Sequence, residues 1–131
     1  MKESIIGNKS KAFAIRIVKL YCYLKDEKSE YVMSKQLLRS GTSIGANTRE
    51  SRNAQSRMDF LNKLNIALKE ADETEYWLDL IHETGFLNHD EYNSIYNDCE
   101  ELISILTDNK NIKRWEQIKN SQLSTLNSQL W

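Results

Sequence analysis

The stretch that decides the fold is residues 56–92, SRMDFLNKLNIALKEADETEYWLDLIHETGFLNHDEY. Apolar side chains recur through most of it at three- and four-residue spacing, which predicts a helix of about 28 residues, roughly 40 Å long. Ser56 and Asp59 have the spacing of an N-terminal capping pair. Gly85 stands where a left-handed residue ends a helix.

The end of this helix and the start of the next are both specified. Phe86 follows Gly85 at the position that packs back on Ile81 when a helix closes with a Schellman motif. Asn88 and Glu91 have the spacing of a capping box, and apolar residues continue at helical spacing through the following turns. We therefore expect a tight turn and another helix directly after it.

Two further helices are expected before this stretch. Apolar residues at helical steps predict helices over about residues 10–27 and 31–54, separated by a charged break. The second contains Gly41 and Gly45, four residues apart on one face, and each costs the helix about 1 kcal/mol in propensity. A packing reason is therefore expected, namely a groove in which another backbone comes close.

Composition agrees with an all-α chain. The 131 residues include no proline and only 4 glycines, too few for the many turns of a β-sandwich or barrel. Four amphipathic helices with short connections predict an antiparallel up-down-up-down four-helix bundle over residues 1–109, followed by a polar C-terminal tail over residues 110–131. No apolar run of about 18 residues is present and the start lacks a signal-peptide core, so we expect a cytoplasmic protein and no membrane partner.

The predicted topology sets a register between the second and third helices. If the turn between them centres near residues 54 and 55, Leu64 and Leu68 of the third helix lie level with the two glycines and would fill the glycine groove.

The same register places charged residues of the two helices together. Arg39 lies level with Glu70, and Lys35 lies near Glu73. We expect Arg39 and Glu70 to form a semi-buried salt bridge.

The tail has a different composition, rich in Asn, Gln, Ser and Lys. Leu123, Leu126 and Leu130 stand at coiled-coil steps, but two heptads are fewer than the three or four that identify a coiled coil. Two alternatives stay open: a frayed or disordered end, or a short amphipathic helix that docks on a neighbour.

A net charge of -1 conceals a strong polarity along the chain. Residues 1–69 carry 14 Lys and Arg against 6 Asp and Glu, whereas residues 70–109 carry 12 Asp and Glu and no Lys or Arg. Packing of the two halves as antiparallel helices would satisfy much of this charge internally. Alternatively, a basic face on one copy meets an acidic face on the next, a heterologous contact that can close into a ring.

The sequence offers little for a metal or a nucleophile. A di-iron bundle needs two Glu-x-x-His motifs and two further glutamates, whereas only Asp79 and His82 have a comparable spacing. Cys22 and Cys99 have no CxxC partner, and we expect both to be small buried hydrophobes. No catalytic residue, metal or cofactor is therefore predicted.

The acidic residues of the third helix divide into two sets. Glu70 and Glu73 are expected to point toward the basic second helix, whereas Asp72 and Glu75 are expected to point toward solvent or a neighbouring subunit. A catalytic carboxylate pair is not expected here.

Basic residues are the remaining functional candidates. Solvated helix faces also explain such clusters, but a ring would repeat them around its rim and attract RNA or DNA. The first group surrounds the predicted turn between the second and third helices: Arg49, Arg52, Arg57 and Lys63. The second lies in the tail and would add a stacking contact to single strands: Lys110, Lys113, Arg114 and Trp115.

Two stretches carry a family resemblance: residues 34–47, SKQLLRSGTSIGAN, and residues 60–78, FLNKLNIALKEADETEYWL. Together they closely resemble the small bacterial four-helix bundle proteins first met as reading frames in 23S rRNA intervening sequences. The resemblance covers about residues 10–107 and leaves the tail outside. The positions that look characteristic of the family are Gln36, Arg39, Ser40, Gly41, Ser43, Gly45, Asn47, Glu70, Glu73 and Trp77.

The resemblance implies an up-down bundle without enzymatic activity that assembles as a ring, typically a homopentamer. It also implies kinship with the accessory variability determinant of diversity-generating retroelements, a pentamer that binds nucleic acid and a reverse transcriptase through basic surface. We therefore expect a homo-oligomeric scaffold or adaptor, with a nucleic-acid-binding accessory factor as the alternative.

Overall fold

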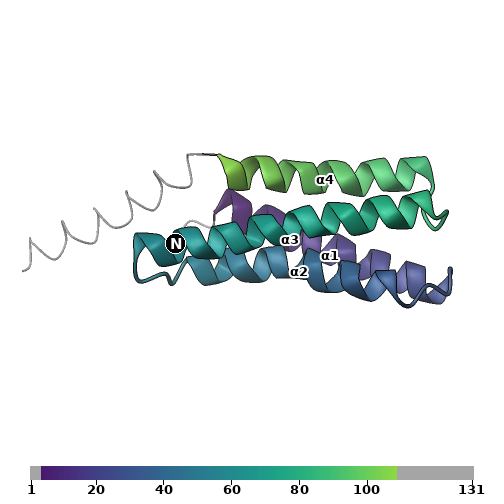
Figure 1. Ribbon diagram of the computed structural model, residues 1–131, viewed down its shortest axis with the longest axis horizontal. Helices are drawn as coiled ribbons and strands as arrows, with labels where there is room; N and C mark the ends of the chain where they lie inside the picture. The colour runs from purple at the N-terminus through teal and green to yellow at the C-terminus, as the bar shows by residue number, and fades with distance from the viewer. Residues whose placement is uncertain (1–3, 109–131) are drawn as a thin grey trace, which may run out of the picture.

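Four helices make up the computed structural model, which describes residues 4–108. They are α1 (Ile5–Asp26), α2 (Met33–Ser51), α3 (Arg57–Glu83) and α4 (His89–Thr107). Short connections join consecutive helices at alternating ends, so that neighbours run antiparallel (Figure 1). This is the predicted all-α bundle. The predictions about the tail, including its basic residues, its leucines and Trp115, lie outside the described residues.

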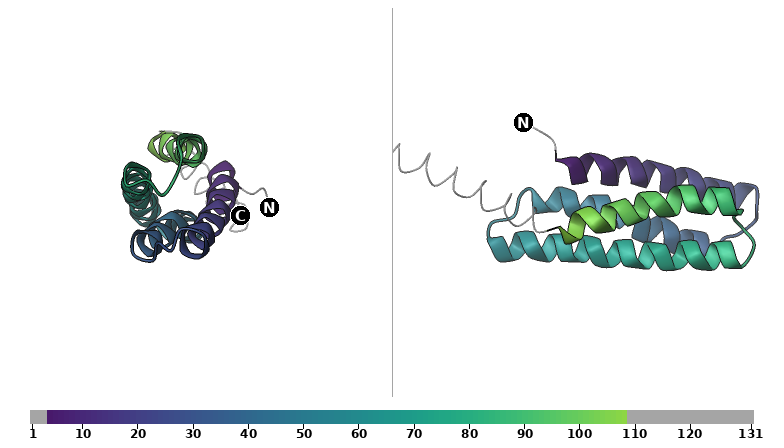
Figure 2. Two further views of the ribbon diagram at one scale, coloured as in Figure 1. Left: turned by 90° about the vertical axis from the view of Figure 1, so that its right-hand side faces the viewer. Right: turned by 90° about the horizontal axis from the view of Figure 1, so that it is seen from above.

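The helices stand at the corners of a square in the order α1, α2, α3, α4, so that α1 and α3 lie at opposite corners (Figure 2). No helix within residues 4–108 has the length and apolar character that a membrane span needs. One apolar core runs through the bundle, and all four helices contribute to it. Its fully buried side chains include Phe13, Ile17, Leu24, Leu37, Ile44, Leu78, Ile81 and Leu102.

The first helix begins earlier than its apolar pattern predicted, at Ile5 rather than at residue 10. The Ser4 hydroxyl accepts a hydrogen bond from the Gly7 N–H at 2.9 Å, and Ile6 is buried in the core. A capping serine and one buried apolar residue are therefore enough to add the extra turn.

The second helix is shorter at both ends than predicted, and a side chain outside it forms its cap. The carboxylate of Glu30 accepts hydrogen bonds from the N–H groups of Val32, Met33 and Ser34, at 3.0, 2.9 and 2.7 Å. Glu30 is only 7% exposed. Burial opposes its charge, but the three N–H donors outweigh this and hold the pKa of Glu30 below its usual range.

The turn between α3 and α4 forms as the sequence predicts. Gly85 has a φ of 90°, in the left-handed region. The Phe86 N–H donates to the Ile81 carbonyl at 3.1 Å, which completes the Schellman motif. Asn88 and Glu91 form a reciprocal capping box at the start of α4.

The start of α3 forms half of the predicted box. The Ser56 hydroxyl accepts from the Asp59 N–H at 3.0 Å. The shorter Asp59 side chain does not return to the Ser56 N–H but accepts from the Gln55 N–H at 3.4 Å.

Candidate functional site

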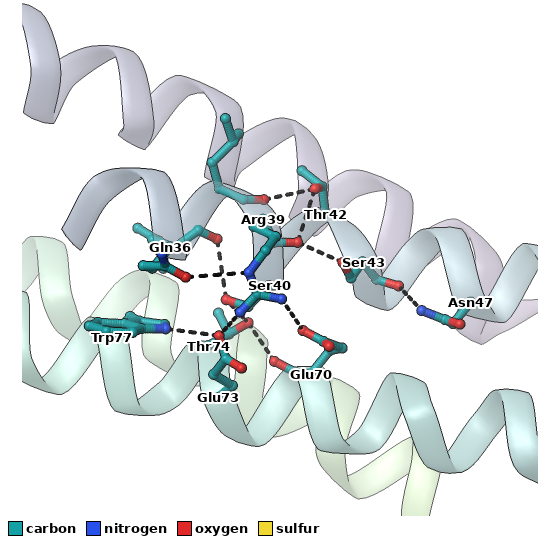
Figure 3. Close-up of polar contacts among 12 residues, drawn as sticks. Gln36, Arg39, Ser40, Thr42, Ser43, Asn47, Glu70, Glu73, Thr74 and Trp77 are labelled. Carbon is teal, nitrogen blue, oxygen red and sulfur yellow. Dashed lines mark hydrogen bonds and ion pairs between the residues drawn. The ribbon is translucent and has the colours of Figure 1, made fainter. Parts of the chain in front are cut away.

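Five of the family-like residues form a polar cluster on the seam between α2 and α3 (Figure 3): Gln36, Arg39, Glu70, Glu73 and Trp77. The Arg39 guanidinium forms the predicted ion pair with Glu70, at 3.2 Å, and a second ion pair with Glu73. The Trp77 indole N–H donates to the same Glu73 carboxylate at 3.0 Å. Gln36 accepts from the Arg39 Nε at 3.4 Å. One arginine therefore binds two turns of α3, and the Trp77 ring fixes the farther carboxylate.

This cluster agrees with the sequence prediction in one respect and differs from it in another. The Glu70 side chain is 19% exposed and the Arg39 side chain 47% exposed, so the pair is semi-buried as expected, but only on its carboxylate side. Arg39, rather than Lys35, binds Glu73, because Glu70 and Glu73 are one helical turn apart and a guanidinium has donors for both.

Hydroxyl groups join α2 and α3 directly below the cluster. The Thr74 hydroxyl donates to the Ser40 hydroxyl at 3.0 Å, and both residues are fully buried. The other two polar residues of the motif stay within α2: the Ser43 hydroxyl donates to the Arg39 carbonyl, and the Asn47 amide donates to the Ser43 carbonyl. These two therefore stabilise the helix itself rather than its seam with α3.

The two glycines of α2 face α1, so the prediction that leucines of α3 fill their groove is wrong. A Cβ on Gly41 would lie 2.8 Å from the Cγ atoms of Ile17, and one on Gly45 would lie 3.4 Å from the Ser10 carbonyl oxygen. Residues two apart on a helix point about 200° apart. Because Arg39 faces α3, Gly41 must face away from it.

The seam between α3 and α4 is acidic, and it contains Glu75. The prediction that Glu75 points to solvent or to another subunit is wrong, because it lies beside Tyr96 and Glu100 of α4. Its Oε2 atom has neither solvent contact nor a hydrogen-bond partner. Burial, followed by the neighbouring Glu100 carboxyl and then the charge of Asp72, raises the pKa of Glu75 to about 7.

Asp79 and His82, the two residues with a metal-like spacing, both contact Tyr92 of α4. The Tyr92 hydroxyl donates to the Asp79 carboxylate, and the His82 ring stacks on the Tyr92 ring with centroids 4.2 Å apart. In the part of the chain that the structure describes, no group of three or more His, Cys, Asp and Glu side chains is arranged to hold a metal ion.

The two cysteines differ in environment. Cys99 is fully buried, and burial raises the pKa of its thiol far above the usual range. Cys22 is exposed on α1, so the prediction of two buried cysteines is correct only for Cys99. The difference follows from the helix faces, because Cys22 lies on the side of α1 that points away from Ile17 and Leu24 of the core.

The four basic residues near the α2–α3 turn do not form one patch of free charge. Lys63 pairs with Glu50 at 2.9 Å, which raises the pKa of the Lys63 amine. Arg49, Arg52 and Arg57 are exposed. The Arg52 guanidinium reaches the start of α1, where it lies 3.1 Å from the position of a Cβ on Gly7.

Large apolar side chains are exposed on the outer faces of α1 and α3. On α1 they include Ile15 and Val18, 50% and 44% exposed, with Cys22 one turn further on. On α3 they include Ile66 and Tyr76, 41% and 58% exposed. Sequence periodicity did not single out these faces, because apolar residues there are outnumbered by polar neighbours.

The fold and these seams define a four-helix bundle protein with a polar α2–α3 motif. A model of the 23S rRNA-intervening sequence protein family matches residues 2–108, and the chain belongs to this family. A crystal structure of a protein of unknown function from the S23 ribosomal protein family of Bacteroides thetaiotaomicron VPI-5482 is similar, with 59% sequence identity and a TM-score of 0.77. The alignment covers 78% of this chain and 94% of that one. No curated protein matches the chain.

Proposed function

We propose that the chain is a non-enzymatic scaffold or adaptor that acts as a homo-oligomeric ring, with five copies as the expected number. The observation that carries this proposal is the exposed apolar side chains on two opposite helices, α1 and α3. Burying a fully exposed apolar side chain contributes about 1.5–3 kcal/mol, so each of these half-exposed side chains would contribute roughly half of that in a contact. Two different faces on one copy favour heterologous contacts, which form rings when the rotation closes.

A scaffold role agrees with the environment of the reactive groups. Glu75 has a raised pKa, but its buried oxygen lies in a seam between helices, away from solvent. The buried Cys99 thiol is held in its neutral form. Neither group is placed to meet a substrate, which favours binding over catalysis.

Light scattering behind size exclusion tests the proposal. We expect a mass near five times 15.4 kDa for the full chain. Val18→Glu should lower this mass because it places a charge in the apolar face of α1, whereas Asn97→Glu, on the outer face of α4, should leave it unchanged. A monomeric full chain would contradict the proposal.

Nucleic-acid binding is the second candidate, and exposed Arg49 and Arg52 at one end of the bundle favour it. Carboxylates neutralise other basic residues, among them Arg39, Arg16 and Lys63, so a ring would have to multiply a small patch. Arg49→Glu with Arg52→Glu should abolish salt-dependent binding of RNA or DNA. Unchanged affinity would contradict this function without affecting the ring.

A further inference from the structure

The outer face of α1 combines an apolar stripe with positive charge. Ile15, Val18 and Cys22 follow one another at three- and four-residue steps, so they share one side of the helix, and all are exposed. Lys11 and Lys19 flank the stripe. Neither lysine forms an ion pair with a carboxylate of residues 4–108. This face is therefore available for a partner that has apolar and acidic groups.

The outer face of α3 has the complementary chemistry at its middle. Tyr76 and Ile66 are exposed there, and the Asp72 carboxylate lies one turn before Tyr76. Within the described residues Asp72 has no ion pair. Lys69 also lies on this face of α3, one turn before Asp72. The face is therefore basic at Lys69 and acidic from Asp72 toward Tyr76.

The contacts through α2 fix the height of α1 relative to α3. The Ile17 side chain packs on the backbone of Gly41. Ser40, the residue before Gly41, hydrogen-bonds to Thr74 of α3. Ile17 is therefore nearly level with Thr74 along the bundle axis.

The contacts through α4 independently give the same position of α1 relative to α3 along the bundle axis. Arg16 pairs with Asp98, and the adjacent Cys99 lies 3.4 Å from the Ala71 carbonyl. Both routes place the turn around Arg16 and Ile17 level with residues 71–74 of α3. Helices α1 and α3 run in the same direction. Along the bundle axis, Val18 therefore lies slightly before the level of Tyr76 and Cys22 slightly after it.

Building on the proposed function, we propose that the occupant of the α1 face is a second copy of this chain, which presents its α3 face. Copies related by rotation about an axis parallel to the bundle have no shift along it. Val18 and Cys22 of one copy then meet Tyr76 of the next, and Lys19 approaches Asp72. Lys69 falls level with the small side chain of Ala12.

The charges disfavour the self-paired alternative. Two α1 faces brought together would place lysines against lysines, and like charges across a contact weaken it. The α1-to-α3 contact instead pairs Lys19 with an acidic residue. The contact is also heterologous, since one copy contributes its α1 face and the next copy contributes its α3 face.

Crosslinking of the full chain tests this contact with the native Cys22 as one partner. Cys99 is buried, so in the wild type only Cys22 is exposed to a short bismaleimide. Tyr76→Cys should convert the wild-type single band into a ladder of linked copies that ends at the subunit number. Asp72→Cys, which leaves Tyr76 in place, should give the same ladder. Asn97→Cys, on the outer face of α4, is the matched control and should give none.

The other outcomes separate this inference from the proposed function. Linked dimers of the wild type, or of Cys22→Ser combined with Tyr76→Cys, would show a self-paired face and overturn the inference. An oligomeric mass by light scattering with no ladder from either variant would also overturn it and leave the ring intact. A monomeric wild type would overturn both.

Discussion

Helices α2 and α4 occupy opposite corners of the bundle, and they are attached in different ways. Helix α2 meets α1 at a backbone glycine, Gly41, and meets α3 through the two ion pairs of Arg39. Helix α4 meets α1 through two exposed ion pairs, Arg16 with Asp98 and Lys9 with Glu101, each at 2.5 Å. It meets α3 at the acidic seam around Glu75.

The difference shows how one helix can form two kinds of seam. On its α2 side, α3 places Glu70 and Glu73 against an arginine, so the charges attract at any pH near neutrality. On its α4 side, Glu75 faces Glu100, so the packing depends on protonation. We therefore expect substitutions at α2 to cost stability, and removal of charge at the α3–α4 seam to add it.

The largest effect is expected from Gly41→Leu. The new side chain must occupy the space of Ile17, which is already in contact, so the free energy of unfolding should fall by at least about 3 kcal/mol. Ala46→Leu, at an exposed position of the same helix, is the control and should change little. Urea unfolding followed by circular dichroism measures both, and equal stability of the two variants would contradict the close α1–α2 approach.

Glu30→Gln is expected to come next, with a loss of about 2 kcal/mol at pH 7, because a neutral amide accepts the three N–H bonds of the α2 start more weakly. The folded pKa of Glu30 is lowered, so its contribution is present above the unfolded value of 4.5 and is lost as the pH falls through the folded value. The deficit of the variant should therefore shrink in acid. Glu27→Gln, just outside α1, is the control, and a deficit that does not change with pH would refute the cap.

Glu75→Gln is expected to act in the opposite direction. The folded pKa of about 7 lies above the ordinary 4.5, so protonation stabilises the fold, and the wild type loses that stability as the pH rises between these values. At pH 8 the variant should be more stable by on the order of 1–2 kcal/mol after solvent screening, with the gain fading below pH 5. Thermal unfolding across pH measures this gain, and a variant less stable than the wild type at pH 8 would contradict the acidic seam.

The smallest effects are expected at the exposed ion pairs. Arg39→Ala should cost about 1 kcal/mol, because it removes the cation that two carboxylates share, whereas Arg16→Ala should cost about 0.5 kcal/mol or less. Added salt should reduce both losses. Urea unfolding measures both losses. A larger loss for Arg16→Ala would contradict the expectation that the ion pairs of α2 contribute more stability than those of α4.

Local sequence signals were sufficient for the helix ends that neighbouring residues make. Gly85, Asn88 and Glu91 specify the α3–α4 turn because every bond in it joins residues a few positions apart. Glu30 was missed although its bonds are equally local, because a glutamate three residues before a helix looks like part of a charged loop. Its burial, which no spacing indicates, is what distinguishes it.

The candidate site was predicted in part. The pairing of Arg39 with Glu70 followed from register alone, since an antiparallel turn fixes which residues are level. The direction of the glycines and of Glu75 did not follow, because level residues can still point to different neighbours. Which neighbour a side chain meets depends on the rotation of each helix about its axis.

The sequence by itself determined that the chain is all-α, that it has four helices in antiparallel order, and that one arginine of α2 meets α3. Those properties depend on periodicity and on bonds between near neighbours, which a linear pattern records. Only the tertiary structure decided that the glycines receive α1, that two carboxyls meet between α3 and α4, and that apolar side chains stand outward on α1 and α3. These properties depend on the rotation of each helix about its own axis once its apolar stripe is buried. That rotation is set by the packing of all four helices against one another.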